Sequence, residues 1–147
     1  MSLTEAQLLE DVRQRLFAPS RSATPRAVGL ELELIPLVKS TRKPALVARG
    51  SSPSTGDVLS QLGERERWTE QPAGDDPSSW TLRDGARISF EPGGQLEIST
   101  SPHATASSAI ESTRAVIGVL GDAMAKEGIE LIARGVDPYN EIGRAHV

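Results

Sequence analysis

The chain has 147 residues, a formal net charge of −4 and no cysteine. Its length suits one domain, and 37% hydrophobic residues are enough for a modest aliphatic core. The acidic balance disfavours a nucleic-acid surface, and the lack of cysteine excludes disulfides, thiolate metal sites and a thiol nucleophile. No apolar run approaches membrane-spanning length and no leader pattern opens the chain, so we expect a cytoplasmic protein without a membrane partner.

The first predicted element is a helix over residues 4–17. Thr4 and Gln7 have the spacing of a capping box at its start. An apolar stripe along this helix is expected to pack on a sheet, and it consists of Leu8, Leu9, Val12 and Leu16. A polar linker rich in Pro, Ser and Arg follows over residues 18–26.

Residues 27–37 predict a strand, because apolar and polar side chains alternate strictly over seven of them. One face carries Glu31 and Glu33, and glutamate is a poor strand former. The opposite face carries the aliphatic side chains Val28, Leu30, Leu32 and Leu34. Two carboxylates on an otherwise apolar strand suggest a role beyond folding.

The middle of the chain predicts short elements joined by polar loops. Residues 39–54 are basic and rich in Pro and Ser, as is typical of a solvated loop, and residues 57–62 can form a short helix. Residues 67–70 and 80–83 resemble strands around a loop over residues 72–79.

Residues 88–99 predict a β-hairpin around a Pro-Gly-Gly turn. A two-residue loop would pair Phe90 with Gln95 and mix apolar and polar side chains on one face. A three-residue loop, 92–94, instead places Glu91 opposite Gln95. One face of the hairpin is then fully apolar, and the other carries Ser89, Glu91, Gln95, Glu97 and Ser99.

A longer helix is predicted from Ser108, which can form a second capping box with Glu111, to residue 127. Its expected apolar face consists of Ile110, Ile117, Leu120 and Met124. Gly128 is expected to end the helix, and a strand is predicted over residues 129–133.

If the two acidic strands are neighbours, four carboxylates gather on one face: Glu31, Glu33, Glu91 and Glu97. An isolated pair of strand glutamates would be interpreted as an ordinary solvated face. Several carboxylates close together repel one another unless they are protonated or neutralised by a cation. Such hard oxygen ligands suit Mg²⁺, Mn²⁺ or Ca²⁺.

The two acidic segments resemble motifs of the glutamate–cysteine ligase family, in its plant and bacterial branch. Residues 29–33 read Gly-Leu-Glu-Leu-Glu, like the Gly-x-Glu-x-Glu motif of that family. Residues 91–99 read Glu-Pro-Gly-Gly-Gln-Leu-Glu-Ile-Ser, which matches its second, longer and more specific motif. A softer match is Gly-Val-Asp-Pro at residues 135–138, and the resemblance spans about residues 26–139.

This resemblance implies an α+β fold, namely part of a glutamine-synthetase-like antiparallel sheet with flanking helices. It implies ATP-dependent formation of γ-glutamylcysteine from L-glutamate and L-cysteine through γ-glutamyl phosphate, in glutathione or ergothioneine biosynthesis. ATP and Mg²⁺ or Mn²⁺ are the implied cofactors. By resemblance, Gln95 contacts substrate or nucleotide, and the metal ligands are Glu31, Glu33, Glu91 and Glu97; no catalytic residue is assigned.

Residues 1–140 are interpreted as the amino-terminal part of such a catalytic domain, in a truncated form expected to be inactive alone. Residues 141–147, Glu-Ile-Gly-Arg-Ala-His-Val, match the translation of a sequencing adapter and are interpreted as a non-native read-through tail. Two alternatives stay open. One is a carboxylate–amine ligase with another amine acceptor, and the other is a non-catalytic acidic β-domain that binds a metal or a protein partner.

Overall fold

A computed structural model describes residues 4–17, 26–50, 52–73 and 76–140 of the chain. These residues form helices and a single six-stranded antiparallel sheet, so the α+β class is confirmed. None of the helices within these ranges has the length and apolar character needed to cross a membrane. Six strands make the sheet: β1 (Glu31–Val38), β2 (Thr69–Ala73), β3 (Asp76–Thr81), β4 (Arg87–Phe90), β5 (Leu96–Ser99) and β6 (Ile129–Ile132).

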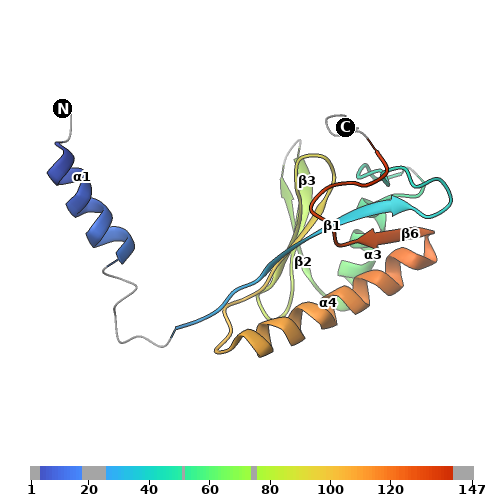
Figure 1. Cartoon of the computed structure of the whole chain (residues 1–147). Helices are drawn as coiled ribbons and strands as arrows, with labels where there is room; N and C mark the ends of the chain where they lie inside the picture. The colour runs from blue at the N-terminus through green and yellow to red at the C-terminus, as the bar shows by residue number, and fades with distance from the viewer. Residues whose placement is uncertain (1–3, 18–25, 51, 74–75, 141–147) are drawn as a thin grey trace.

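The strand order is β2-β3-β4-β5-β1-β6 (Figure 1). Strands β2 to β5 follow one another as hairpins, and each pairs with its neighbour in sequence. Strand β1 then lies between β5 and β6, although β5 follows it by more than fifty residues of chain. The first acidic strand is therefore the direct neighbour of the acidic hairpin, as the sequence interpretation requires.

The core lies on one face of the sheet, under helices α3 (Thr55–Glu66) and α4 (Ala106–Lys126) (Figure 1). Fully buried side chains come from both layers: Leu59 and Leu62 from α3, Leu120 and Met124 from α4, and Ile88, Leu96 and Ile98 from the hairpin. Each such side chain contributes about 1.5–3 kcal/mol through its removal from water. The apolar face predicted for the hairpin is thus the face that holds the helices.

Helix α4 begins earlier than predicted, and its predicted apolar face is confirmed only in part: Leu120 and Met124 are fully buried, and Ile117 is half-buried against the core. Its N-cap is Thr105, whose Oγ1 accepts a hydrogen bond from the Ser108 amide at 3.1 Å, so the Ser108–Glu111 capping box is wrong. Ile110, expected in the apolar face, is 42% exposed. The stripe that faces the sheet is Ala109, Thr113, Val116, Leu120 and Met124. Ala109 and Thr113 are small residues that are buried against the core, where Thr113 Oγ1 donates to the Ala109 carbonyl at 2.9 Å.

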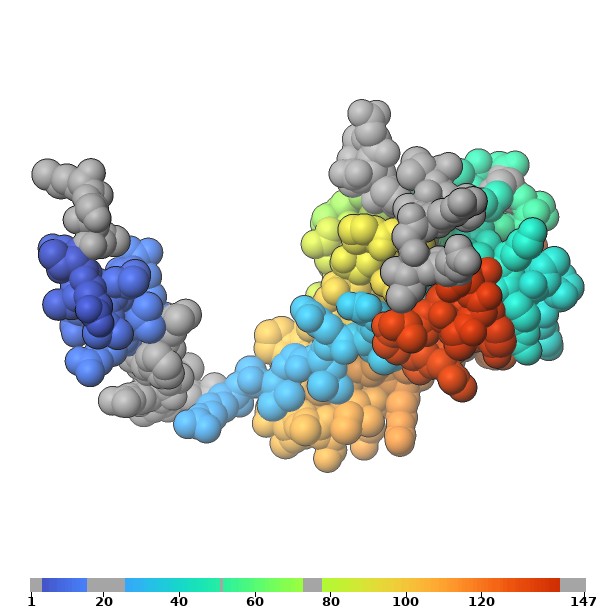
Figure 2. Space-filling model, turned by 45° about the horizontal axis from the view of Figure 1, so that its top comes forward, coloured from blue at the N-terminus to red at the C-terminus, as the bar shows by residue number. Residues whose placement is uncertain are grey.

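The predicted first helix covers the expected residues, as an α-helix followed by a π-helical turn, but it does not pack on the sheet. Helix α1 (Glu5–Val12) has the predicted Thr4–Gln7 capping box, and a π-helical turn, η1 (Arg13–Phe17), follows it. Leu8 and Leu9 are 53% and 54% exposed, and α1 lies apart from the rest of the molecule (Figures 1 and 2). The packing prediction for its stripe is wrong in this structure, because α3 and α4 already cover the apolar face of the sheet.

The structure also differs from the predicted boundaries of two other segments. The loop predicted over residues 72–79 is mostly strand, since β2 runs to Ala73 and β3 starts at Asp76. Pro72 is tolerated because β2 is an edge strand, where a missing N–H need not cost a ladder bond. The short helix predicted at residues 57–62 extends to the whole of α3, and Arg67, predicted in a strand, ends that helix with φ +58°.

Candidate metal and substrate site

The turn of the acidic hairpin has the predicted three-residue loop. The Glu91 amide donates to the Gln95 carbonyl at 2.8 Å, and the Gly94 amide donates to the Glu91 carbonyl at 2.9 Å. Further along the ladder, Ser89 is opposite Glu97 and Phe90 is opposite Leu96. The polar and apolar faces of the hairpin are therefore sorted as the sequence predicted.

Gly94 is required in this turn for two reasons. Its φ is +83°, a left-handed conformation that side chains with a Cβ adopt at a cost. A Cβ at this position would also lie 3.0 Å from Cγ2 of Val47, in the loop between β1 and α3. The turn is thus held against the neighbouring loop, which fixes where Glu91 and Gln95 project.

Strand β1 places its two glutamates beside the hairpin. Glu33 is directly opposite Glu97, and Glu31 is opposite Ser99. Ser99 Oγ donates to Glu97 Oε1 at 2.9 Å and so orients that carboxylate. Directly opposed side chains on neighbouring strands have Cβ atoms about 4.5–5.5 Å apart, where like charges are destabilising. No ion pair to Glu33 or Glu97 is formed within the described ranges.

The other two predicted ligands flank this pair. Glu31 is two residues before Glu33 on β1, and Glu91 is two residues beyond Ser89, the partner of Glu97. All four side chains are exposed or half-buried on the sheet face that α3 and α4 leave open. Among residues 4–17, 26–50, 52–73 and 76–140, no three His, Asp or Glu side chains lie close enough to hold a metal ion. The structure brings together one opposed pair and leaves two carboxylates beside it.

The carboxylates of Glu33 and Glu97 are nevertheless of the chemical type that binds a divalent cation. The opposed pair offers hard carboxylate oxygens, has water access and forms no ion pair with a cationic side chain in the part of the chain that the structure describes. A bound cation would offset the repulsion between Glu33 and Glu97. Two protein carboxylates, with substrate oxygens and water completing the shell, are also a common arrangement for Mg²⁺.

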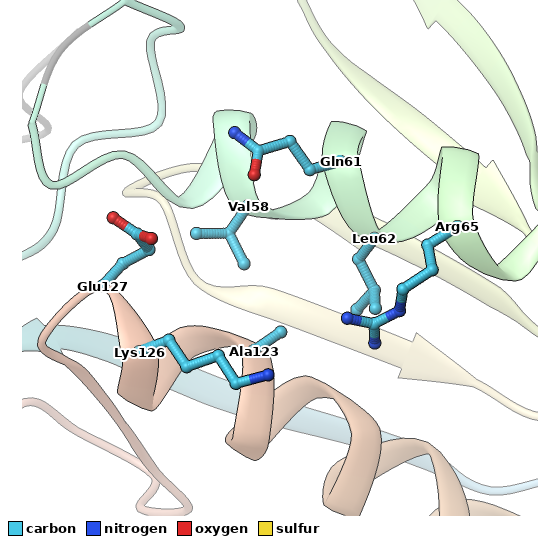
Figure 3. A pocket seen from close by; sticks show the side chains of 7 residues that line it. All are labelled: Val58, Gln61, Leu62, Arg65, Ala123, Lys126 and Glu127. Atoms are coloured by element: carbon cyan, nitrogen blue, oxygen red, sulfur yellow. The ribbon is translucent and has the colours of Figure 1, made fainter.

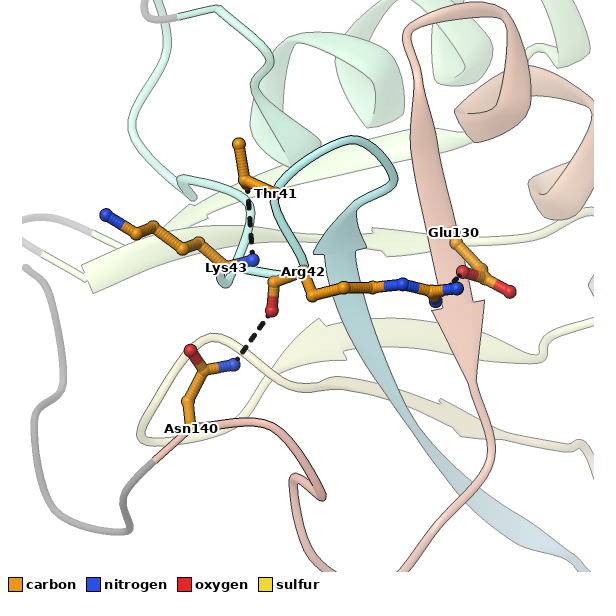
Figure 4. A network of polar contacts seen from close by, with 5 residues as sticks. All are labelled: Thr41, Arg42, Lys43, Glu130 and Asn140. Atoms are coloured by element: carbon orange, nitrogen blue, oxygen red, sulfur yellow. Dashed lines mark hydrogen bonds and ion pairs between the residues drawn. The ribbon is translucent and has the colours of Figure 1, made fainter.

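A polar network near β6 was not predicted from the sequence (Figure 4). Arg42, in the turn after β1, forms an ion pair with Glu130 and lies over the Tyr139 ring at 5.3 Å. Asn140 Nδ2 donates to the Arg42 carbonyl at 3.0 Å, and Asp137 accepts the Tyr139 amide at 2.8 Å. The Gly-Val-Asp-Pro segment is thereby held against the turn after β1. The partners are nearly a hundred residues apart, so no local pattern could indicate them.

A small hollow of about 220 Å³ lies between α3 and α4, on the side of the sheet away from the glutamates (Figure 3). Its apolar residues are Val58, Leu62 and Ala123, and its rim is polar, with Gln61, Arg65, Lys126 and Glu127. Since it is separated from the acidic face by the sheet and core, it belongs to a different part of the molecule from the candidate site.

Residues 27–147 match the family described as glutamate-cysteine ligase family 2 (GCS2). The chain belongs to this family. The match begins at the strand that carries Glu31 and Glu33 and includes the whole sheet, whereas α1 lies outside it. It also includes residues 141–147, whose read-through origin stays a prediction. No curated protein matches the chain significantly. Membership places the chain in a ligase family, whose substrates are small molecules.

Proposed function

We propose that this chain carries part of the active site of an ATP-dependent glutamate–cysteine ligase, acting in glutathione or ergothioneine biosynthesis. The observation that supports this most is the direct pairing of Glu33 with Glu97 on the open face of an antiparallel sheet. These residues belong to the two motifs by which the chain resembles the family, and that family matches residues 27–147.

In the proposed site, the open face binds Mg²⁺ or Mn²⁺ through carboxylates. Glu33 and Glu97 are the central ligands, and Glu31 and Glu91 complete the set when substrates are bound. Ser99 supports the site by its hydrogen bond to Glu97. Gln95, held opposite Glu91 by the turn, offers an amide to the substrate or the nucleotide. A divalent cation held by these carboxylates would supply positive charge that screens the repulsion between ATP and the glutamate carboxylate.

The reaction that this face would serve has two steps. An oxygen of the glutamate γ-carboxylate attacks the γ-phosphorus of ATP, forming γ-glutamyl phosphate and releasing ADP. The cysteine amine then attacks the acyl carbon, phosphate leaves, and the amine loses a proton. Both reactants of the first step are anions, so a site made of carboxylates needs cations to admit them. The open sheet face supplies positions for these cations and a rigid support for them.

We further propose that residues beyond Asn140 in a longer chain supply the rest of the site. The support is the incomplete convergence of the four glutamates within the described ranges. The 147-residue protein is then expected to release no ADP in the presence of glutamate and cysteine. Clear turnover by the purified 147-residue protein would contradict this part of the proposal.

The decisive assay uses the reading frame restored beyond residue 140. We expect ADP release that requires L-glutamate, Mg²⁺ and L-cysteine, and that falls by about two orders of magnitude or more in Glu97→Gln. Glu111→Gln, the same substitution at an exposed position of α4, is the matched control and should retain activity. Turnover with other amines but not with cysteine would assign a different carboxylate–amine ligase. An absence of turnover with every amine would reject the ligase proposal.

A further inference from the structure

Arg87 lies on the same open face as the four glutamates but pairs with none of them. On β4 it is directly opposite Ser99 of β5, and Ser99 is opposite Glu31 of β1. A row of directly opposed residues therefore crosses three strands, from the cationic Arg87 through Ser99 to the anionic Glu31. Strands in a sheet are about 4.8 Å apart, so the two ends of this row are separated by roughly 10 Å along the sheet.

The guanidinium of Arg87 is oriented away from the carboxylates. Its Nη2 donates to Ser79 Oγ at 3.1 Å, and Ser79, on β3, is only 6% exposed. The buried serine is a fixed partner on the side of β4 opposite to β5 and β1. A guanidinium has five N–H groups, and this bond uses one of them. The exposed Arg87 side chain therefore keeps donors available for an anion.

The open face is thus divided by charge. Its β5 and β1 side carries three of the carboxylates proposed to hold the cation, Glu31, Glu33 and Glu97, whereas Arg87 is at the start of β4 and Glu91 follows the far end of that strand. A substrate with two carboxylates can use both sides, with one carboxylate near the bound cation and one on the guanidinium. Arginine is suited to this role because its planar fork can bind a carboxylate through two parallel hydrogen bonds.

We propose that Arg87 binds the α-carboxylate of glutamate and so determines that the γ-carboxylate is activated. This inference rests on the proposed function, because it takes glutamate as the substrate. The α- and γ-carboxylates have similar chemistry, and a site of metal ions alone would not distinguish them. Arg87 holds the α-carboxylate over β4, away from the phosphoryl group on the acidic side.

The test is a titration of the ¹⁵N-labelled 147-residue protein in Mg²⁺. The Arg87 Nε–Hε resonance is assigned by its absence in Arg87→Gln. L-Glutamate is expected to shift this resonance saturably, whereas 4-aminobutyrate, which keeps the γ-carboxylate but lacks the α-carboxylate, should leave it in place. Arg114, an exposed arginine on α4 on the other side of the sheet, is the internal control and should not respond to either compound.

The same spectra measure affinity through the backbone amides of Glu33 and Glu97. Arg87→Gln is expected to weaken glutamate binding at these amides by about tenfold or more, as for the loss of a charged hydrogen-bond partner. Arg114→Gln should leave the affinity unchanged. Because Arg87 is exposed, both variants should keep the dispersed spectrum of the folded protein.

Four results would overturn the inference. Movement of the Glu33 and Glu97 amides with glutamate, without any shift of Arg87, would reject it and leave the proposed function in place. An equal response to 4-aminobutyrate would show that the α-carboxylate is not what Arg87 recognises. A response to MgATP alone would assign Arg87 to phosphate instead. If neither Arg87 nor the two amides respond to Mg²⁺ with glutamate, glutamate does not bind this face and the inference fails, whereas the proposed function is tested separately by ADP release from the restored longer chain.

Discussion

On one face of the β4–β5 hairpin, Ile88, Leu96 and Ile98 are completely buried under α3 and α4, whereas Ser89 and Glu97 on the other face stay half-exposed. The two faces use the same backbone and the same register. Burial explains why the residues on the first face are apolar, because α3 and α4 remove them from water. It does not explain the second face, where an opposed pair of glutamates costs stability. The open face is therefore where a functional explanation is needed.

The largest predicted effect belongs to the buried face. Ile98→Ala should lower the free energy of unfolding by about 2–5 kcal/mol, because it removes buried methyl groups and leaves a cavity. Glu97→Gln, at the neighbouring residue on the opposite face, is the matched control and should not lower it, because this change removes one of two opposed like charges. Urea denaturation followed by circular dichroism measures both. Equal destabilisation by the two variants would contradict the division of the hairpin into two faces.

The next effect concerns the turn that joins the two strands. Gly94→Ala should destabilise the protein by about 1–3 kcal/mol, since it combines a left-handed φ with a close approach to Val47. A Cβ added at Gly93 would meet no atom within 4 Å. Gly93→Ala should therefore destabilise the protein only through the backbone cost of its φ of +102°. Gly94→Ala in a Val47→Ala background isolates the contact with Val47, and an equal loss of stability in both backgrounds would show that this contact contributes no energy.

Divalent cations should stabilise the protein through the open face. At a free Mg²⁺ concentration ten times its dissociation constant, linkage predicts about 1.4 kcal/mol of added stability. Thermal unfolding with and without Mg²⁺ measures the gain. We expect it to be lost in Glu33→Gln and in Glu97→Gln but kept in Glu111→Gln on α4. Retention of the full gain in Glu33→Gln would place the cation elsewhere.

Without a divalent cation, the opposed pair should be slightly destabilising. Glu33→Gln is then expected to raise the free energy of unfolding by about 0.2–1 kcal/mol at low ionic strength, because it removes one of two opposed like charges. High monovalent salt should reduce this gain by screening. Urea titrations at two salt concentrations measure it, and a loss of stability in Glu33→Gln at low salt would argue against repulsion.

The smallest predicted effect is at Glu70, a glutamate that has protein partners. The hydrogen bond from Ser78, together with Arg49, lowers the pKa of Glu70 below its usual value. A lowered folded-state pKa adds stability above the unfolded-state pKa, 4.5 for this group, and that stability is lost as pH falls through the folded-state value. Glu70→Gln should therefore be slightly less stable than the wild type at pH 7 and equal to it at low pH. A difference that persists unchanged at low pH would contradict the role assigned to its charge.

The sequence predicted the hairpin in detail because its register follows from local alternation and from the turn. Faces of opposite character allow only one loop length, and the structure has that length. The sequence raised the neighbourhood of the two acidic strands only as a condition, and the direct pairing of Glu33 with Glu97 could not be predicted because β1 and β5 are far apart in sequence. The contacts of Arg42 with Tyr139 and Asn140 could not be predicted, because they depend on how distant segments meet.

The errors also have physical causes. The periodicity of α1 correctly indicated an amphipathic helix, but periodicity does not say what covers an apolar stripe. In α4, the large aliphatic Ile110 was assigned to the buried face, whereas Ala109 and Thr113 occupy it. Close packing of a helix on a sheet selects by volume as well as by polarity.

The central claim is that the open face binds a divalent cation at Glu33 and Glu97. Paramagnetic broadening by substoichiometric Mn²⁺ in the ¹⁵N spectrum of the 147-residue protein tests it most directly. We expect selective broadening of the amides of Glu33, Glu97 and Ser99, without broadening of α4, and the loss of this broadening in Glu97→Gln but not in Glu111→Gln. Broadening that is centred on α3 or α4, or that persists unchanged in Glu97→Gln, would contradict the claim.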